Sequence, residues 1–391
     1  MHIPKLAIIT THPIQYNAPL FKVLSSRGRV AVKVFYTWGQ SRDKVYDARF
    51  GIERNWDVPL LDGYDYEFIN STTKAPDSNR FFGIVNKGLY RRLLKEEYDA
   101  VLIYRWSLWS HFLLMQKLGG KPLLFFRGDS HLLQQPSGWK RLLKKWLLRF
   151  VYRKVDMAFA TGTHSRDYFL FSGLKPQQVL IAPHAVDNNF FSTDAPAKET
   201  EALQQRRQLG IPDEAVVFLY AGKFYGVKQL HLLINAYKNL PSSQYYLLLV
   251  GNGEEEASLK SLAADHPRII FQSFQNQSAM PVVYRTGDVF VLPSKSETWG
   301  LSINEAMACE RPVIVSDQCG CAPDLIKSGT TGFVFESGNT VQLQQLLLKF
   351  SDRAVSQKMG KQASAYINEF SLERIAAAIE ERLLQKIAMS L

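Results

Sequence analysis

The chain has 391 residues, of which 46% are hydrophobic, and it carries a formal net charge of +11. This length exceeds what one hydrophobic core usually serves and predicts two domains of about two hundred residues each. No apolar run approaches the roughly 18 residues that cross a bilayer, and three cysteines are too few for a disulfide framework. The composition therefore argues against a membrane-spanning or disulfide-stapled protein and predicts a soluble, cytoplasmic one.

Charge is divided unevenly along the chain. Residues 1–190 contain 28 Lys and Arg against 15 Asp and Glu, a net +13, whereas residues 191–391 contain 19 against 21, a net −2. Such an asymmetry indicates that the first half meets an anionic partner, and the candidates are a nucleic acid, a membrane surface and an acidic substrate.

Short apolar runs alternate with amphipathic segments, which is typical of βαβ units and a parallel sheet. The first run, KLAIIT, predicts a core strand rather than part of a cleavable leader. Later runs are VAVKVFYT, AVLIYRW, KPLLFF, MAFATG and VLIAPHA, then VVFLYAG, YYLLLVG, RIIFQSF, DVFVLPS and RPVIVSD. We predict an α/β protein with Rossmann-like domains at 1–192 and 200–370, a polar linker in STDAPAKETEALQQ (192–205), and a terminal helix over 371–391.

The segment GWKRLLKKWLLRFVYRKV, residues 138–155, predicts an amphipathic helix with seven basic residues and no acidic one. The helix either lies on anionic lipid or packs an ordinary apolar stripe into the domain core. On lipid, each basic residue near the surface adds about 1 kcal/mol to the free energy of membrane binding. A nucleic acid is a rival partner, but no reading motif is present and the segment is rich in Trp and Leu. We expect an anionic membrane surface, no nucleic acid, and a peripheral position on the cytoplasmic face.

The stretch SKSETWGLSINEAMACERPVIVSD, residues 294–317, sets two carboxylates, Glu297 and Glu305, around a helix predicted to begin near Gly300. Backbone amides at a helix N-terminus suit phosphate oxygens. Carboxylates would repel phosphate, so they are better explained as acceptors for hydroxyl groups on either side of it. A ligand with phosphates in the middle and polyhydroxyl rings on both sides is a sugar nucleotide.

Cations for such a ligand follow an earlier strand, in LYAGKFYGVKQL. Lys223 and Lys228 lie there beside Gly222, and a second glycine turn, with Gly251 and Gly253, follows the next strand. By itself each signal is weak, because a lysine at the end of a strand is usually a solvated surface residue.

The run from GKFYGVKQL through LLVGNGE to VFVLPSKSETWGLSINEAMACERPVIVSDQCGCAPDLIKSGTTGFVF resembles the C-terminal domain of the retaining glycosyltransferases of family 4, which have the GT-B fold. Their signature, E-x7-E, is two glutamates separated by seven residues, matched by Glu297 and Glu305. The N-terminal half is similar more loosely, through KVDMAFATGTHSRDYFLFSGLKPQQVLIAPHAVDNNFF and THPIQYNAPLF. The resemblance implies two Rossmann-like domains facing across a cleft, with the C-terminal helix packing back towards the first.

The resemblance also implies roles for individual residues. Glu305 would hold the ribose hydroxyls, Glu297 would lie against the transferred sugar and the diphosphate, and Lys223 and Lys228 would bind the diphosphate. The rest of the donor site would consist of Gly222, Gly251, Gly253, Phe274, Thr298, Trp299, Gly300 and Leu301. Three departures from the family pattern concern the sugar pocket: Lys223 for a commoner arginine, Glu310 for a small residue, and Gly320–Cys321 for a double glycine.

The acceptor side is expected in the N-terminal domain, where FFRGDSHLL ends a strand with Arg127, Asp129 and His131. Asp129 and His131 resemble a His-Asp pair that touches the transferred sugar in the family. His12, after the first strand, is a further candidate for the diphosphate or the acceptor. The alternative for both histidines is a structural role in a loop.

The implied activity is transfer of a hexose or N-acetylhexosamine from a nucleotide-diphosphate sugar to a glycan or lipid-linked acceptor, in surface polysaccharide, lipopolysaccharide or glycolipid synthesis. The resemblance implies retention of configuration and no metal or other cofactor, and we expect a UDP-sugar rather than a GDP-sugar. The rivals are a catalytically silent sugar-nucleotide-binding subunit, a relative that isomerises or phosphorolyses sugars, and a basic nucleic-acid-binding protein.

Overall fold

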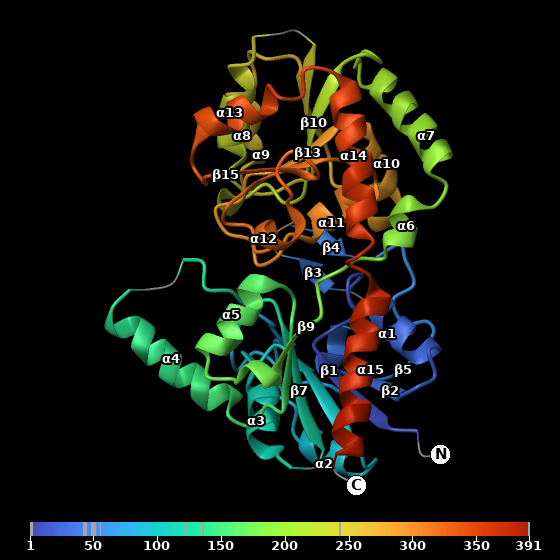
Figure 1. Ribbon diagram of the computed structural model, residues 1–391, viewed down its shortest axis with the longest axis vertical. Helices are drawn as coiled ribbons and strands as arrows, with labels where there is room; N and C mark the ends of the chain where they lie inside the picture. Colours follow the sequence, from blue (N-terminus) through green and yellow to red (C-terminus); the bar gives the residue numbers. More distant parts are fainter. Residues whose placement is uncertain are drawn as a thin grey trace. The chain divides into compact units, whose positions relative to one another are not determined.

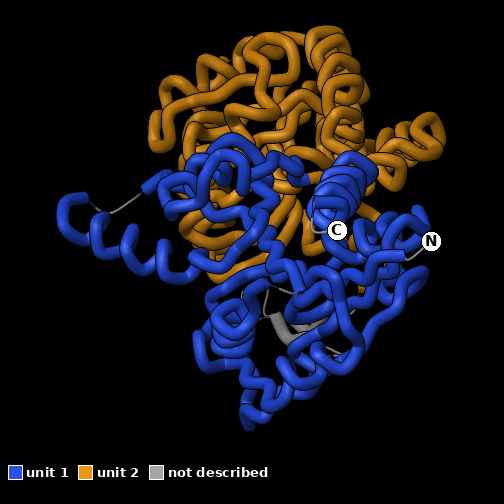
Figure 2. The backbone as a smooth tube through the Cα atoms, turned by 60° about the horizontal axis from the view of Figure 1, so that its bottom comes forward, with its two compact units in different colours: residues 1–45, 59–184, 372–391 blue, residues 46–58, 185–371 orange. Residues whose placement is uncertain are grey.

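A computed structural model describes residues 3–41, 45–47, 52–54, 56–120, 122–134, 137–241 and 244–389. The chain forms two compact units (Figure 2). Unit 1 consists of Met1–Val45, Pro59–His184 and Leu372–Leu391, and unit 2 consists of Tyr46–Val58 and Ala185–Ser371. Neither unit is a single stretch of sequence, because the last helix belongs to the first unit.

Unit 1 is built on a seven-stranded sheet in the order β5-β2-β1-β6-β7-β8-β9, and all of its neighbouring strands are parallel. The strands are β1 Lys5–Thr10, β2 Ala31–Tyr36, β5 Asp65–Phe68, β6 Ala100–Tyr104, β7 Leu123–Gly128, β8 Met157–Ala160 and β9 Val179–Ile181. Leu6 of β1 lies between Val32 of β2 and Ala100 of β6. The strand order therefore reverses between β1 and β6.

Unit 2 contains a six-stranded parallel sheet in the order β12-β11-β10-β13-β14-β15. Its strands are β10 Val216–Ala221, β11 Tyr245–Val250, β12 Ile269–Gln272, β13 Val289–Leu292, β14 Val313–Ser316 and β15 Gly332–Phe335. A separate two-stranded sheet pairs β3 (Val45–Asp47) with β4 (Ile52–Arg54). The predicted α/β fold with two Rossmann-like domains is confirmed, and β3, β4, β5 and β15 are strands that the sequence did not indicate.

Helices cover the sheets as βαβ units require (Figure 1). In unit 1 they are α1 Ala18–Ser26, α2 Leu89–Leu94, α3 Trp109–Lys117, α4 Trp139–Tyr152, α5 Thr163–Phe171 and α15 Leu372–Ala388. In unit 2 they are α6 Asn188–Ser192, α7 Ala195–Gln208, α8 Leu230–Lys238, α9 Glu256–Leu262, α10 Met280–Thr286, α11 Leu301–Ala308, α12 Ala322–Leu325, α13 Thr340–Leu347 and α14 Arg353–Ile367. One core cluster of unit 1 joins α2, α3, α4 and α5 to residues of β1, β6, β7 and β8.

The expected linker is wrong, because most of it is helix α7. Its alanines, glutamates and glutamines are strong helix formers, and a proline occupies its first turn, where no amide partner is lost. Ala202 and Arg206 are buried, and the Arg206 guanidinium lies 2.9 Å from the Asp288 carboxylate. One face of α7 packs against α10. The segment is polar because its other face meets solvent.

The C-terminal helix α15 packs against α1 within unit 1. Ile375, Ile379 and Leu383 are buried at helical spacing. Glu380 on the same helix is fully buried and accepts a 2.8 Å hydrogen bond from Arg27, which follows α1. The predicted return of the last helix to the first domain is therefore present.

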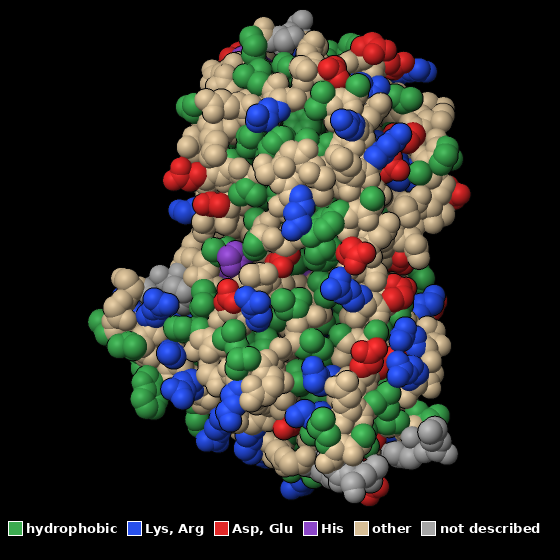
Figure 3. Space-filling view, in the orientation of Figure 1, with side chains coloured by type: hydrophobic (Ala, Val, Ile, Leu, Met, Phe, Trp, Pro, Cys, Tyr) green, Lys and Arg blue, Asp and Glu red, His purple; other side chains and the backbone are tan. Residues whose placement is uncertain are grey.

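Helix α4 does not bury its apolar stripe as a core helix would. Only Leu148, Val151 and Tyr152 near its C-terminal end are buried. Six other apolar side chains are 45–73% exposed: Trp139, Leu142, Leu143, Trp146, Leu147 and Phe150. Figure 3 shows apolar and basic side chains side by side over this helix, which projects at the lower left of Figure 1. Within the described ranges, no helix has the length and hydropathy of a membrane span.

Candidate functional site

The predicted donor residues gather in unit 2, at the carboxyl ends of β10, β11, β12 and β13. The strand order reverses between β10 and β13, and ligands of open α/β sheets bind at such a switch point. The loops that follow the two strands are joined by a 2.8 Å hydrogen bond from the Lys295 amide to the Val227 carbonyl. These loops carry the two central side chains of the site.

Lys228 and Glu297 form an ion pair across the switch point. Lys228 ends a short 3-10 turn after β10, and its Nζ donates to Glu297 Oε2 in the loop after β13. The two side chains are 13% and 20% exposed. Burial by itself lowers the pKa of Lys228, but the charge and hydrogen bond of Glu297 outweigh burial and raise that pKa above its usual value. Lys228 is therefore a fixed cation at neutral pH.

Glu305 lies on the second turn of α11, the helix that follows the Glu297 loop, and is 3% exposed. Its Oε2 accepts a 2.5 Å hydrogen bond from the Tyr284 hydroxyl, and its Oε1 lies 3.5 Å from the Gln277 amide nitrogen. Burial raises the pKa of Glu305 to about 7, against the smaller opposing effects of Tyr284 and Gln277. A carboxylate kept in an apolar place with few donors has free accepting capacity for a ligand hydroxyl.

The loop between Glu297 and α11 turns its carbonyls towards the loop that follows the neighbouring strand β14. The carbonyls of Glu297 and Trp299 accept from the amides of Gly320 and Cys321, at 2.9 and 3.2 Å. Gly300 caps α11 with φ of 97°, a conformation that favours glycine. The first amides of a helix have no partner within it, so those of α11 can serve a phosphate, as the sequence predicts.

The Trp299 side chain is structural. It is 2% exposed, and its Nε1 donates a 2.9 Å hydrogen bond to Asn304 Oδ1 on α11. Thr298 beside it is exposed. The tryptophan thus fixes the loop, while the threonine is accessible to a ligand.

The glycines after β10 and β11 allow the two loops to pack on each other. A Cβ on Gly251 would lie 1.9 Å from the Gly222 carbonyl oxygen, and a Cβ on Gly253 would lie 2.3 Å from the Phe224 oxygen. Glycine is therefore needed at these positions because the backbones of the two loops approach each other closely. Lys223 is held in the same turn, where its carbonyl accepts a 2.8 Å hydrogen bond from the Tyr220 hydroxyl.

Phe274 and Leu301 complete the predicted donor residues. Phe274 is half-buried and follows β12, two strands away from β10 in the sheet. Leu301 is half-buried and begins α11.

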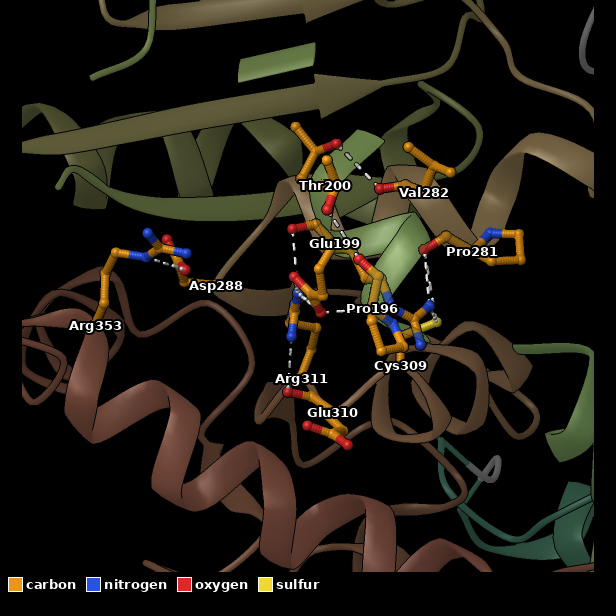
Figure 4. A network of polar contacts seen from close by, with 12 residues as sticks. Pro196, Glu199, Thr200, Pro281, Val282, Asp288, Cys309, Glu310, Arg311 and Arg353 are labelled. Atoms are coloured by element: carbon orange, nitrogen blue, oxygen red, sulfur yellow. Dashed lines mark hydrogen bonds and ion pairs between the residues drawn. The ribbon is translucent and has the colours of Figure 1, made fainter. Parts of the chain in front are cut away.

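A network of polar contacts joins α7, α14, the residue before β13 and the loop after α11 (Figure 4). Arg311, just after the helix, donates to both oxygens of Glu199 on α7, at 2.6 and 2.8 Å. Asp288 at the start of β13 pairs with Arg353 of α14 at 3.0 Å. Glu310, which precedes Arg311, has φ of 58°, in the left-handed region that favours glycine.

The acceptor-side candidates lie in unit 1, around the carboxyl end of β7. Arg127 is 3% exposed and donates a 2.7 Å hydrogen bond to the Ala182 carbonyl. Burial lowers its pKa, and the charge of Asp129 acts in the opposite direction. Burial also lowers the pKa of His184 to about 4, with a further lowering from Arg127. Arg127, Asp129 and His184 are thus near neighbours.

The two histidines that the sequence predicted for the site lie in different surroundings. His131 is half-buried in the loop after β7. His12 follows β1, where its Nδ1 lies 2.9 Å from the Thr11 hydroxyl and its ring meets Trp38 edge-on at 5.5 Å. Both stand at the carboxyl edge of the sheet, and their roles stay predictions.

Arg105 was missed by the sequence reasoning. It follows β6 at the switch point of unit 1 and has φ of 64°, a strained conformation for a residue with a side chain. The buried His111 lies behind it, with Nδ1 2.9 Å from the Arg105 carbonyl and 3.0 Å from that of Tyr104. Burial lowers the pKa of His111 to about 4. Nothing in the letters YRW indicates this conformation.

Tyr284 and Gln277, the partners of Glu305, were also missed. They precede it by 21 and 28 residues, and no spacing rule links them to it. Among the described residues, no group of three or more His, Cys, Asp or Glu is arranged to hold a metal ion.

Residues 202–366 match the model of the family described as glycosyl transferases group 1. Among curated proteins, sulfoquinovosyl transferase SQD2 of Arabidopsis thaliana is 28% identical over 222 residues, which cover 56% of this chain and 42% of that protein. The N-acetyl-alpha-D-glucosaminyl L-malate synthase of Bacillus anthracis is 28% identical over 186 residues, 46% of this chain and 48% of that protein. The alignments thus span about half the length of these relatives.

Two solved structures share the whole fold. Anabaena HepE in complex with UDP and glucose aligns with a TM-score of 0.71 and 18% identity, over 98% of this chain and 99% of that one. WaaG, a glycosyltransferase involved in lipopolysaccharide biosynthesis, aligns with a TM-score of 0.66 and 16% identity, over 97% and 99%. The fold is that of GT-B glycosyltransferases.

Proposed function

We propose that this chain is a glycosyltransferase of group 1 that takes its sugar from a nucleotide-diphosphate donor. The observation that carries the proposal is the Lys228–Glu297 ion pair at the switch point of unit 2, with the buried Glu305 on the helix that follows. It falls within the segment that matches the glycosyl transferases group 1 model. HepE, which has the same fold, is described in complex with UDP and glucose.

Each side chain has a role in this proposal. Glu305 accepts hydrogen bonds from the ribose hydroxyls, and Lys223 and Lys228 bind the diphosphate together with the first amides of α11. Glu297 lies against the transferred sugar. Without ligand, its carboxylate balances the Lys228 ammonium; a bound diphosphate takes over that cation and releases Glu297 for hydroxyl groups.

Transfer breaks the bond between the anomeric carbon and the diphosphate, which leaves with the electron pair. An acceptor hydroxyl oxygen forms the new bond to that carbon, and its proton goes to the departing diphosphate. Fixed cations and helix amides stabilise the departing anion more than they stabilise the intact donor. Each such group typically raises the rate of the chemical step by a factor of about 10² to 10³. We propose that transfer retains the anomeric configuration and needs no divalent ion, since two lysines supply the charge. The transferred group is a hexose or N-acetylhexosamine, and the nucleotide is UDP rather than GDP.

The test is release of free nucleotide from a panel of UDP-glucose, UDP-N-acetylglucosamine, UDP-galactose and GDP-mannose. We expect one donor to be hydrolysed slowly by the wild type, and Lys228→Ala and Glu297→Ala to lower that rate by about 10² or more. A thermal-shift measurement with each nucleotide detects binding independently of turnover. A ligand at a hundred times its Kd raises the free energy of unfolding by about 2.7 kcal/mol. Binding without turnover of any donor would indicate the silent sugar-nucleotide-binding subunit instead.

We further propose that unit 1 binds the cytoplasmic face of an anionic membrane through α4, and that the acceptor is a glycan or lipid-linked sugar there. The support is the exposed apolar face of α4 beside the basic residues of 138–155. Apolar burial and attraction to anionic lipid add on such a helix. Co-sedimentation with phosphatidylglycerol vesicles tests this, with phosphatidylcholine vesicles and duplex DNA as controls. Retention by DNA alone would favour the nucleic-acid alternative.

A further inference from the structure

A pocket of about 480 Å³ lies in unit 1 between α2 and α3. Its inner wall includes Leu89 and Leu114, which are 3% and 2% exposed. Asn86 and Ser110 join the two helices at the base, where the Asn86 amide donates a 2.7 Å hydrogen bond to the Ser110 hydroxyl. The volume falls in the range of about 300 to 1,000 Å³ that small-molecule sites occupy. No donor-site residue lines this pocket.

The rim of the pocket is positively charged. Lys87, Arg91 and Lys117 line it and are exposed, and no Asp or Glu is among the lining residues. Lys117 Nζ lies 5.4 Å from the centroid of the Tyr90 ring, which also lines the pocket. An apolar interior with three cations at its mouth is complementary to a molecule with a hydrocarbon part and a phosphate.

Aromatic side chains connect this pocket to the exposed face of α4. Trp109, in the pocket wall, meets Phe82 at 5.4 Å between ring centroids and Phe112 at 6.2 Å, and Phe112 meets Phe150 of α4 at 6.2 Å. Phe82 and Phe150 are 63% and 45% exposed. A series of aromatic contacts therefore connects the wall of the pocket to α4.

We propose that the pocket between α2 and α3 holds the phosphate headgroup and first carbons of an anionic lipid, whose remaining chain follows the aromatic side chains towards α4. The cations at the rim bind the phosphate, and Leu89, Leu114 and Trp109 cover the carbons next to it. The inference rests on the proposed function, in which unit 1 binds an anionic membrane. It adds a specific site for one lipid to the general attraction between basic residues and a charged surface. It concerns unit 1 alone and no residue of the donor site.

The experiment measures binding of dihexanoyl phosphatidic acid, a lipid with short chains, below its micelle concentration and by calorimetry. Dihexanoyl phosphatidylcholine and inorganic phosphate are the comparison ligands. The test variant is Arg91→Glu with Lys117→Glu. The matched control is Lys95→Glu with Lys361→Glu, which changes the net charge equally at exposed lysines that do not line the pocket. A second variant, Leu113→Trp, fills the pocket without changing charge.

We expect the wild type to bind phosphatidic acid about tenfold or more tightly than either comparison ligand. Both pocket variants should lose this preference, and the control should keep it. Equal loss in the test and control variants would overturn the proposal in favour of bulk electrostatic attraction. Equal binding of inorganic phosphate would overturn it in favour of a free-phosphate site, and saturable self-association at this face would indicate a second copy of the chain.

Nucleotide binding separates this proposal from the donor site. In each variant, thermal shift with UDP reports on unit 2, and circular dichroism reports that the chain is folded. Normal UDP binding with lost lipid preference supports the pocket. If the wild type binds lipid but no nucleotide, the proposed function is rejected and the lipid pocket is supported. If the wild type binds UDP but shows no lipid preference, only the lipid pocket is rejected.

Discussion

At the scale of single residues, Glu305 differs most from its expected environment. The sequence predicts this carboxylate on a helix, beside the hydroxyl groups of a ligand. The structure buries it against Tyr284, and burial raises its pKa to about 7. This couples both the stability of the protein and its proposed ribose contact to pH.

The contribution of Glu305 to the stability of the folded protein should fall as pH rises from about 4 to about 7. Over that range the unfolded chain releases the Glu305 proton near its ordinary pKa of about 4.3, whereas the folded protein retains it until about 7. The loss is on the order of 3 kcal/mol and is complete above the folded pKa. Glu305→Gln should lack this component, and urea unfolding of both proteins at pH 5 and pH 8 measures the difference. An identical pH dependence in the two proteins would contradict the assignment.

Nucleotide affinity should change with pH in the opposite sense. Ribose hydroxyls donate to the ionised carboxylate, so UDP binding to the wild type should strengthen by about tenfold between pH 6 and pH 8. Glu305→Gln should bind UDP more weakly and without this change. Calorimetric titrations at the two pH values test it, and a wild-type affinity that is level from pH 6 to pH 8 would place the ribose elsewhere.

Gly320 is a second residue whose role appears only in three dimensions. A Cβ there would lie 1.9 Å from the Thr298 carbonyl oxygen, which is backbone and cannot rotate away. We expect Gly320→Ala to displace the loop before α11 and weaken UDP binding by about tenfold or more. Gly119→Ala is the control, since the nearest atom to its Cβ is 3.5 Å away in the Lys154 side chain. Unchanged UDP affinity in Gly320→Ala would show that the proposed site tolerates movement of this loop.

At the scale of elements, α4 shows what a pattern can and cannot predict. Its helical spacing and basic composition predicted the helix, which runs over Trp139–Tyr152. The same apolar stripe fits a core helix and a surface helix equally well, so burial could not be read from the letters. Only the neighbouring α3 and α5 decide that Leu148 is buried while Trp146 is 73% exposed.

Replacing the exposed stripe should therefore affect vesicle binding and leave folding intact. We expect Leu142→Ser, Leu143→Ser and Trp146→Ser together to abolish co-sedimentation with phosphatidylglycerol vesicles, since each removes apolar area that is already in water. The melting temperature should change little. Ile3→Ser with Val341→Ser, at side chains that are 54% and 64% exposed, is the control and should retain vesicle binding. Full binding by the triple variant would exclude α4 as the contact.

The strands were predicted better than the connections between them. Buried parallel strands are short continuous apolar runs, and such runs marked β1, β2, β6 and the strands that follow. β5 is polar at its edge position, with Asp65 and Glu67 in four residues, so it has no such signal. Helix α7 was taken for a linker because polarity marks both a solvated helix and a loop.

At the scale of the whole molecule, composition and alternation were enough to predict two Rossmann-like domains, and both parallel sheets are present. The sequence could not indicate that Tyr46–Val58 joins unit 2. There the Asp57 carboxylate accepts from the Ser278 amide at 3.2 Å, across more than two hundred residues of chain. Contacts of such separation depend on topology and leave no local pattern.

Removing α15 should destabilise unit 1 in particular. A chain that ends at Ser371 loses the buried Ile375, Ile379 and Leu383, each worth about 1.5 to 3 kcal/mol, and leaves Arg27 without Glu380. We expect amide exchange in α1 to accelerate by tenfold or more, roughly 1.4 kcal/mol, with β10–β13 unchanged. A chain that ends at Ile387 is the control. Equal protection of α1 in both truncations would show that α15 adds nothing to its stability.

The position of α15 also sets an order of events during translation. The ribosome completes the segment Ala185–Ser371 before it delivers the residues of the last helix, and at about 5 to 20 residues per second this takes roughly 10 to 40 s. For that interval the nascent chain exposes the apolar side of α1 that α15 will cover. Unit 2 can therefore close before unit 1 is complete, although the first residues of unit 1 are translated first.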